Sequence, residues 1–149
     1  LIPILNADYS KTGLGFSYLK RLYNKNAFSI YLGLQSQTNI SFYFNSNYYV
    51  VEQEFGIASR FTYQLNKKQY LTSKITIPVA LLRVTKNSDF NSYSLNRYQS
   101  ALWNLEYGYS LSNSFDIKLN YDFKYNMLQI PNAFRELQHQ INLGVNYKF

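Results

Sequence analysis

Hydrophobic and polar residues alternate along most of this chain with a period of two. Between residues 115 and 127 every odd position, from Phe115 to Met127, is apolar or aromatic, and every even position, from Asp116 to Asn126, is polar or charged. Because a β-strand points successive side chains to opposite faces, this pattern predicts a strand with one apolar face and one charged face. No segment shows the sustained 3.6-residue periodicity of a helix.

The same alternation recurs along the chain and predicts eight strands within a single domain, residues 1–149. The predicted strands cover residues 1–9, 13–22, 27–44, 49–65, 69–84, 100–111, 115–127 and 138–149. Tight turns are expected at 23–26, 66–69 and 112–114, and longer polar loops at 10–13, 45–48, 85–96 and 129–137. Short turns at one end and longer loops at the other are typical of an all-β, antiparallel up-and-down transmembrane β-barrel.

Two details of this arrangement can be predicted as well. An even number of strands places both chain termini at the end that carries the short turns. Pro78 interrupts the predicted strand 69–84. Because proline cannot donate a hydrogen bond to a neighbouring strand, we expect a β-bulge there, or a lost ladder bond facing the lumen.

The charged residues indicate which face of the strands is inside. Six of the eight acidic residues and five of the fifteen basic residues take the polar parity, so this face is nearly neutral. All six glycines share it, and glycine makes room for long neighbouring side chains in a narrow barrel. Since an unpaired buried charge is costly, near-neutrality suits an interior. The polar face is therefore predicted to be inside, and the apolar face to meet lipid.

The charged residues of the polar face are interpreted as a network of salt bridges and hydrogen bonds that fills the barrel interior, because eight strands leave room for little more than side chains. Its predicted members are Glu52, Glu54, Arg60, Lys74, Glu106, Asp116, Lys118, Asp122 and Lys124. A proton relay or a narrow ion path is an alternative, since ionisable groups at membrane depth often have a function.

Aromatic residues gather near both ends of the predicted strands, with aliphatic residues between them, as expected at two membrane interfaces. Tyr70 and Tyr98 are counted among these bands. The net charge of +7 comes mostly from turns and loops at the two rims, and this division disfavours nucleic-acid binding. Cations at the loop rim could bind lipopolysaccharide phosphates, with ordinary solvated charge as the alternative. They are Lys11, Arg83, Lys86, Arg97 and Arg135.

Little in the composition points to catalytic or metal chemistry. The chain has no cysteine, so it has no disulfide framework and no thiolate nucleophile, and its single histidine is His139. A lone histidine and the absence of cysteine argue against a metal site. The sequence also contains no phosphate-binding glycine loop. No metal or other cofactor is expected.

The chain ends in "INLGVNYKF", alternating hydrophobic residues closed by a terminal aromatic. This ending resembles the C-terminal β-signal of bacterial outer-membrane proteins, which implies recognition of Leu143, Val145, Tyr147 and Phe149 by the barrel assembly machinery. Eight strands in this length are similar to the small barrels of the OmpA and OmpX type. The resemblance implies an integral outer-membrane protein with both termini periplasmic. The composition, rich in Asn, Tyr and Lys, is similar to that of AT-rich Gram-negative bacteria such as Bacteroidota.

The expected function is that of a non-enzymatic barrel with a plugged polar interior, either structural or a subunit of a larger secretion or conjugation assembly in the cell envelope, where protein partners are possible. A small transport pore is the main alternative. Some small outer-membrane barrels are lipid-modifying enzymes, but Ile141 stands where their His-x-Ser pairing would place serine after His139. Two structural alternatives stay open: a water-soluble, lipocalin-like barrel, and a fragment of a wider barrel.

Overall fold

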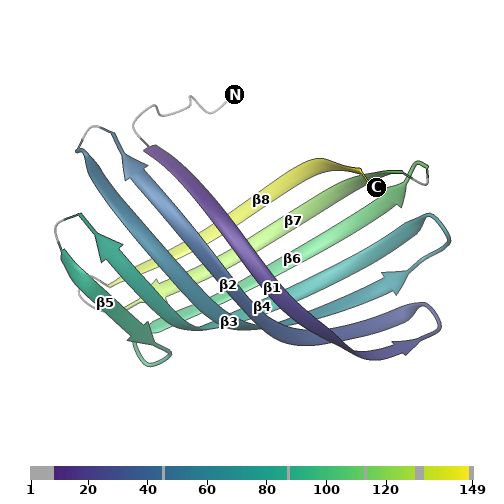
Figure 1. Ribbon diagram of the computed structural model, residues 1–149, viewed down its shortest axis with the longest axis horizontal. Coiled ribbons are helices and arrows are strands. Elements are labelled where there is room, and N and C mark those ends of the chain that lie inside the picture. The colour runs from purple at the N-terminus through teal and green to yellow at the C-terminus, as the bar shows by residue number, and fades with distance from the viewer. Residues whose placement is uncertain (1–8, 45, 87, 113, 130–132, 148–149) are drawn as a thin grey trace.

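The computed structural model describes residues 9–44, 46–86, 88–112, 114–129 and 133–147, which form eight β-strands (Figure 1). The strands are β1 (Tyr9–Lys25), β2 (Phe28–Tyr43), β3 (Tyr48–Gln64), β4 (Gln69–Thr85), β5 (Ser88–Ser94), β6 (Tyr98–Ser110), β7 (Phe115–Leu128) and β8 (Phe134–Tyr147). No helix in this part of the chain is long and apolar enough to cross a membrane.

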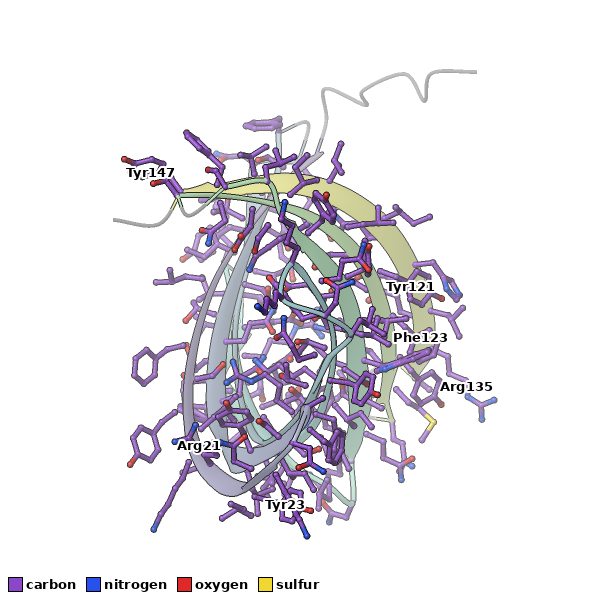
Figure 2. All side chains as sticks on the ribbon, turned by 90° about the vertical axis from the view of Figure 1, so that its right-hand side faces the viewer. Arg21, Tyr23, Tyr121, Phe123, Arg135 and Tyr147 are labelled. Carbon is purple, nitrogen blue, oxygen red and sulfur yellow. The ribbon has the colours of Figure 1, made fainter. Side chains whose placement is uncertain are left out.

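All eight strands belong to one antiparallel sheet with up-and-down connections. The order is β1-β2-β3-β4-β6-β7-β8, and the short β5 pairs with β4 alone. The sheet is strongly curved, and in the end-on view side chains lie within its curve (Figure 2). Within the described residues β1 pairs only with β2 and β8 only with β7, so each of these strands has one backbone edge without a partner strand.

Seven of the eight predicted strands correspond to observed strands. The eighth observed strand, β5, was not predicted. The predicted loop 85–96 is wrong, because it contains β5, a short strand that folds back on β4. The predicted loop 10–13 is also wrong, because β1 runs without a break from Tyr9. The predicted strand 1–9 lies, except for Tyr9, outside the described residues. The expectation that both termini share the turn end depends on that strand.

Asparagines shape the short connections at the turn end. Asn26, between β1 and β2, has a φ of 54°, in the left-handed region that asparagine tolerates better than most residues. In the β3–β4 turn, the Asn66 side-chain oxygen accepts hydrogen bonds from the backbone N–H groups of Lys68 and Gln69, at 2.9 and 3.0 Å. This side chain thereby accepts hydrogen bonds from backbone donors where the chain reverses direction.

The two faces of the sheet have opposite polarity, with the apolar one outside. On the outer face Leu14, Ile141 and Leu143 are 77%, 74% and 76% exposed. On the inner face Glu54 and Asp116 are only 4% and 2% exposed. Polar side chains therefore lie on the concave, less exposed face of the sheet. The inner face also carries all six glycines, as the cross-strand register shows.

A β-bulge interrupts β4 where Pro78 predicts one. Glu54 lies opposite Leu81 and Gly56 lies opposite Pro78, so β4 has one more residue than β3 between these pairs, and the extra residue is Val79. The bulge exchanges the two faces for the residues that follow it. Leu81, which simple alternation places on the outer face, is consequently buried inside.

Leu81 belongs to a small apolar cluster at the loop end. It lies with Tyr93, Tyr98 and Leu128, which come from β5, β6 and β7. The ladder between β4 and β6 ends at Thr76 and Leu102, and from Ala80 onward β4 pairs with β5 instead. The cluster therefore lies where β4 separates from β6. It joins residues of β4 and β5 to residues of β6 and β7.

Two aromatic residues of the predicted interface bands face inward rather than outward. Tyr98 is a buried member of this cluster. Tyr70 lies directly opposite Gly108, and its ring occupies the space that a β-carbon on Gly108 would need. Other members of the bands do meet across neighbouring strands: Phe115 and Tyr147 have ring centroids 5.0 Å apart at the turn end, and Phe42 and Tyr49 are 6.5 Å apart at the loop end.

Replacing Leu81 with alanine is expected to lower the free energy of unfolding by about 2–5 kcal/mol, the usual cost of a cavity at a buried leucine. The matched control is Leu143→Ala, on the exposed outer face, where truncation leaves no cavity and the loss should be much smaller. Urea unfolding of both variants in the same detergent micelles measures the difference. Equal losses would show that the cluster is not a packed core.

Candidate functional site

All nine residues predicted to form the interior network face inward. They come from four strands: Glu52, Glu54 and Arg60 from β3, Lys74 from β4, Glu106 from β6, and Asp116, Lys118, Asp122 and Lys124 from β7. Each has an inward-facing residue as its cross-strand partner, as in the pairs Arg60 with Lys74 and Glu106 with Asn120. The two-residue period of the strands thus collects the charges on one side of a curved sheet.

The most buried ion pair joins strands that are not neighbours. Lys124 Nζ of β7 lies 2.7 Å from Glu54 Oε1 of β3. β4 and β6 separate these strands in the sheet order. A second pair, Lys118 with Glu106 at 3.3 Å, links adjacent strands and is more exposed. The Lys124–Glu54 contact therefore holds together opposite parts of the interior.

A third ion pair includes a residue that the sequence places elsewhere. Arg83 Nε lies 3.5 Å from Glu52 Oε1, and both side chains are about three-quarters buried. Arg83 was predicted at the loop rim; it lies near the loop end of β4, where the bulge at Val79 turns its side chain toward the interior. The charge of Glu52 is thus compensated inside.

Neutral side chains also donate hydrogen bonds to carboxylates of the interior. Asp122 accepts hydrogen bonds from Asn104 at 2.7 Å and from Asn142 at 2.8 Å, and the Ser110 hydroxyl donates to Asp116 at 2.7 Å. Glu136 accepts a bond of 2.6 Å from Gln138. Such bonds offset part of the cost of removing a carboxylate from water.

Sequence reasoning missed Glu136 because it assigned residues 129–137 to a loop. In the structure β8 begins at Phe134, and Glu136 lies opposite Asn126 on the inner face. The signal was present in the sequence, since Glu136 shares the parity of Gln138 and Gln140.

Two basic side chains of the interior lie directly opposite each other. Arg60 and Lys74 are cross-strand partners, and within the described residues no carboxylate lies within 4 Å of either. The Arg60 guanidinium carbon lies 4.1 Å from the centre of the Tyr31 ring, and Lys74 Nζ donates to the Ser17 hydroxyl at 2.8 Å. A cation–π contact and a hydroxyl acceptor stabilise these charges, while like charges opposite each other destabilise the pairing.

Amide side chains form a second, uncharged part of the interior. Gln35 donates to Gln37 at 3.3 Å, Gln37 donates to Asn39 at 3.2 Å, and Thr76 of β4 donates to Gln35 at 3.0 Å. Sequence reasoning did not single these residues out, because it followed charge. Their shared parity on the predicted strand 27–44 is the signal that would have identified them.

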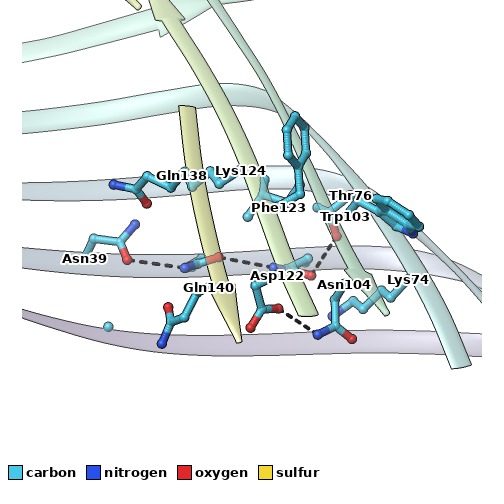
Figure 3. A pocket seen from close by; sticks show the side chains of 14 residues that line it. Asn39, Lys74, Thr76, Trp103, Asn104, Asp122, Phe123, Lys124, Gln138 and Gln140 are labelled. Carbon is cyan, nitrogen blue, oxygen red and sulfur yellow. Dashed lines mark hydrogen bonds between the residues drawn. The ribbon is translucent and has the colours of Figure 1, made fainter. Parts of the chain in front are cut away.

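A cavity of about 630 Å³ lies between these amides and the charged residues of β4, β6 and β7 (Figure 3). Its wall includes Gln35, Gln37, Asn39, Lys74, Thr76, Asn104, Asp122, Lys124, Gln138 and Gln140. Asp122 and Asn104 are joined by a hydrogen bond within this wall. Side chains therefore fill the interior only in part, and the remaining space has polar walls of both charge signs.

The other cations predicted at the loop rim have varied surroundings. Lys86 Nζ donates to the Asn47 backbone carbonyl at 2.7 Å, at the loop end. Arg97 is exposed in the turn between β5 and β6, and Arg135 is exposed on the outer side of β8 (Figure 2). The side chain of Lys11 lies outside the described residues. Lys86, Arg97 and Arg135 thus remain at the loop end.

The predicted C-terminal assembly signal lies on the outer face of β8. Leu143, Val145 and Tyr147 are all exposed there, and Tyr147 packs edge-on against Phe115 of β7. Phe149 lies outside the described residues. The described part of the motif therefore belongs to the outward, apolar face.

His139 belongs to an aromatic group on the outer face rather than to the interior. The Tyr121 hydroxyl and His139 Nδ1 are 2.7 Å apart, and Phe123 packs edge-on against the imidazole (Figure 2). Beside them, Trp103 Nε1 donates to the Ser73 hydroxyl at 2.9 Å. The Tyr121–His139 and Trp103–Ser73 hydrogen bonds thus pair polar atoms that lie on the otherwise apolar outer face.

Among the described residues no group of three or more histidine or acidic side chains is arranged to hold a metal ion. Comparison of the chain with protein-family models, with curated proteins and with solved structures gives no match.

The Glu54–Lys124 pair gives a testable prediction. Glu54→Gln leaves Lys124 as an uncompensated buried charge, and should lower the free energy of unfolding by about 3–5 kcal/mol. Adding Lys124→Met should recover part of this loss, since no charge is then unpaired. The control Glu106→Gln, at the Lys118 pair, should cost less, because both side chains of that pair are more exposed. Urea unfolding of the four proteins supplies the comparison, and a double variant no more stable than Glu54→Gln would contradict the pairing.

Proposed function

We propose that this protein is an integral β-barrel of a bacterial outer membrane, with a structural role or as a subunit of a larger envelope assembly. One observation carries the proposal: the outer face of the curved sheet exposes aliphatic and aromatic side chains, while its inner face buries charged and amide side chains. In water this arrangement would expose a large apolar surface, whereas in hydrocarbon the same surface is favourable.

The alternative of a water-soluble, lipocalin-like barrel is disfavoured by the same observation. Such a barrel would bury residues such as Leu119 and Ile141 and expose Asp116 and Glu54, and the burial of these residues is the reverse. The length of the strands agrees with a membrane role as well. The long strands have 13 to 17 residues, more than the roughly 9–11 that cross the hydrocarbon when tilted.

The proposed partners follow from the two ends of the strands. Lys86, Arg97 and Arg135 at the loop end would bind the phosphates of lipopolysaccharide. The outward residues Leu143, Val145 and Tyr147 would be recognised by the barrel assembly machinery during insertion. A non-enzymatic role is supported by the hydrogen bond of His139, whose partner is the Tyr121 hydroxyl rather than a serine.

A second candidate function is a small transport pore, and the interior cavity of about 630 Å³ is the observation that favours it. The amide and charged side chains of its wall would form hydrogen bonds with a small polar solute. The ion pair Glu54–Lys124 opposes this candidate, because Lys124 lines the same cavity and is held there by the carboxylate of Glu54.

The membrane role is tested by electrophoresis of the purified protein with and without boiling. We expect the unboiled, folded protein to migrate differently from the boiled one and to require detergent for solubility, because a hydrogen-bonded barrel resists unfolding by the detergent of the gel. A monomer that is folded and soluble without detergent would overturn the proposal.

Adjacent arginine substitutions test which face meets lipid. Ile141→Arg on the outer face should lower the free energy of unfolding from lipid vesicles by about 2–4 kcal/mol if the residue lies at the bilayer midplane. Gln140→Arg is the matched control, because Gln140 lies directly opposite Asp122 on the inner face, where a cation gains a partner. The control should therefore cost less, and the opposite ranking would exclude a lipid-facing outer surface.

Conductance in planar bilayers distinguishes the structural role from the pore. A plugged interior predicts no sustained open steps for the native protein. Glu54→Gln and Glu106→Gln are compared in the same bilayers. If open steps appear for Glu54→Gln alone, opening depends on loss of the Glu54–Lys124 pair and not on loss of a carboxylate in general. Sustained steps from the native protein would support the pore instead.

A further inference from the structure

Arg60 and Lys74 bring two positive charges together on the inner face of the sheet. They lie directly opposite each other on β3 and β4, and both side chains are partly buried. Like charges in this position destabilise the pairing of strands, and each also loses part of its hydration. A third cation, Arg21 of β1, extends the same row, because it lies opposite Tyr31, which in turn lies opposite Arg60. Positive charge is therefore concentrated along one row of the inner face.

The interior carboxylates nearest in register to this row have partners of their own. Glu106, opposite the inward residue that precedes Lys74 on β4, pairs with Lys118 at 3.3 Å. Asp122 is held by hydrogen bonds from two asparagine side chains. Within the described residues, no carboxylate lies within 4 Å of any of the three cations of the row. The described chain thus leaves the positive charge of this row without a carboxylate.

Both members of the pair have hydrogen-bond donors that remain available. The Arg60 Nε atom is buried and has no acceptor within the described residues. The Lys74 ammonium has three N–H donors, and one of them goes to the Ser17 hydroxyl at 2.8 Å. The Tyr31 ring, 4.1 Å from the guanidinium carbon of Arg60, restricts the orientation of that group. A guanidinium and an ammonium on facing strands are the donors that carboxylate and phosphate groups bind best.

The interior cavity of about 630 Å³ adjoins this pair. Lys74 belongs to its wall, where Lys74, Asn104 and Asp122 follow one another (Figure 3). Much of the remaining wall consists of amide side chains, namely Gln35, Gln37, Asn39, Gln138 and Gln140. Because an amide both donates and accepts hydrogen bonds, such a wall suits a ligand that carries hydroxyl groups. The cavity therefore combines a positive end with neutral polar sides.

We propose that Arg60 and Lys74 form an anion-binding site that takes a small hydroxylated solute by its carboxylate or phosphate group. Arg60 supplies a planar set of donors and Lys74 supplies a compact positive charge. The amides of the cavity wall form hydrogen bonds with the hydroxyl groups. Since a bound anion also offsets the repulsion between the two cations, it stabilises the folded protein. The site belongs to the inner face alone, so it does not depend on whether the outer face meets lipid.

Isothermal titration calorimetry of the folded protein tests this site with inorganic phosphate, gluconate and glucose. We expect at least one of the two anions to bind, and the one that binds more tightly identifies the preferred anionic group. Glucose, which has hydroxyl groups but no charge, should bind much more weakly. Arg60→Gln and Lys74→Gln should each weaken binding of the anion roughly tenfold or more, the usual effect of losing one charge-assisted hydrogen bond.

The matched control is Lys118→Gln, which removes an interior cation that already has a carboxylate partner. This variant should bind the anion with native affinity. Arg60→Lys keeps the charge but loses the planar set of donors, and is expected to bind with an affinity between those of the native protein and Arg60→Gln. It also replaces Arg60→Gln if that variant does not fold.

Urea unfolding distinguishes a binding role of the pair from a purely structural one. In chloride buffer without oxyanions, Lys74→Gln should be as stable as the native protein or more stable, because it removes the repulsion between the two cations. Addition of phosphate should raise the urea midpoint of the native protein more than that of Lys74→Gln. The general effect of phosphate on protein stability acts on both proteins alike, so the difference between them reports on the site.

Four results would overturn the proposal. Neither anion might as well be present if calorimetry shows no binding of phosphate or gluconate to the native protein. Equal affinity of the anion for the native protein, Arg60→Gln and Lys74→Gln would place its site elsewhere. Glucose binding as tight as that of gluconate would show recognition of hydroxyl groups without the cations. A marked loss of stability in Lys74→Gln without oxyanions would show that Lys74 stabilises the fold by itself.

Discussion

The contact between Lys124 and Glu54 depends on the curvature of the whole sheet. In a flat sheet β3 and β7 would be about 14 Å apart, because three inter-strand spacings of about 4.8 Å separate them. Their side chains nevertheless meet at 2.7 Å. The hydrogen bond from Lys74 to Ser17 joins β4 to β1, again three spacings apart, at 2.8 Å. Contacts of this kind are possible only if the inner face is concave, and they exist only because that face carries the charges.

Much of the fold could be predicted from the two-residue period alone. A strand such as β7 has alternating residues throughout, and the sequence settles both its limits and its faces. β5 could not be predicted in this way, because Ser88–Ser94 is short and polar and its pairing with β4 is decided by the direction in which β4 leaves β6. Local composition there resembles that of a loop, and only the tertiary arrangement makes it a strand.

The candidate site shows the same division. The nine charged residues of the interior were predicted because charge and parity coincide in them. The partners of these residues could not be predicted, since Lys124 finds Glu54 across the interior rather than along the chain. The amides Gln35, Gln37 and Asn39 were missed because the prediction of the interior followed charge, although their shared parity already places them on the polar face. The inward orientation of Arg83 was missed because the extra residue Val79 shifts the alternation of β4 by one position.

That extra residue, Val79, has a consequence for the chemistry of β4. The residues before Pro78 and those after Val79 each alternate regularly, but the two halves are out of phase by one position. In an uninterrupted ladder with the same residues, Arg83 would point outward and Leu82 toward the carboxylate of Glu52. The extra residue therefore keeps Lys74, before the bulge, and Arg83, after it, on the same inner face of the sheet. The number of residues in β4 and the order of its polar and apolar residues are therefore coupled. Deletion of Val79 would require the polar and apolar positions after it to be exchanged.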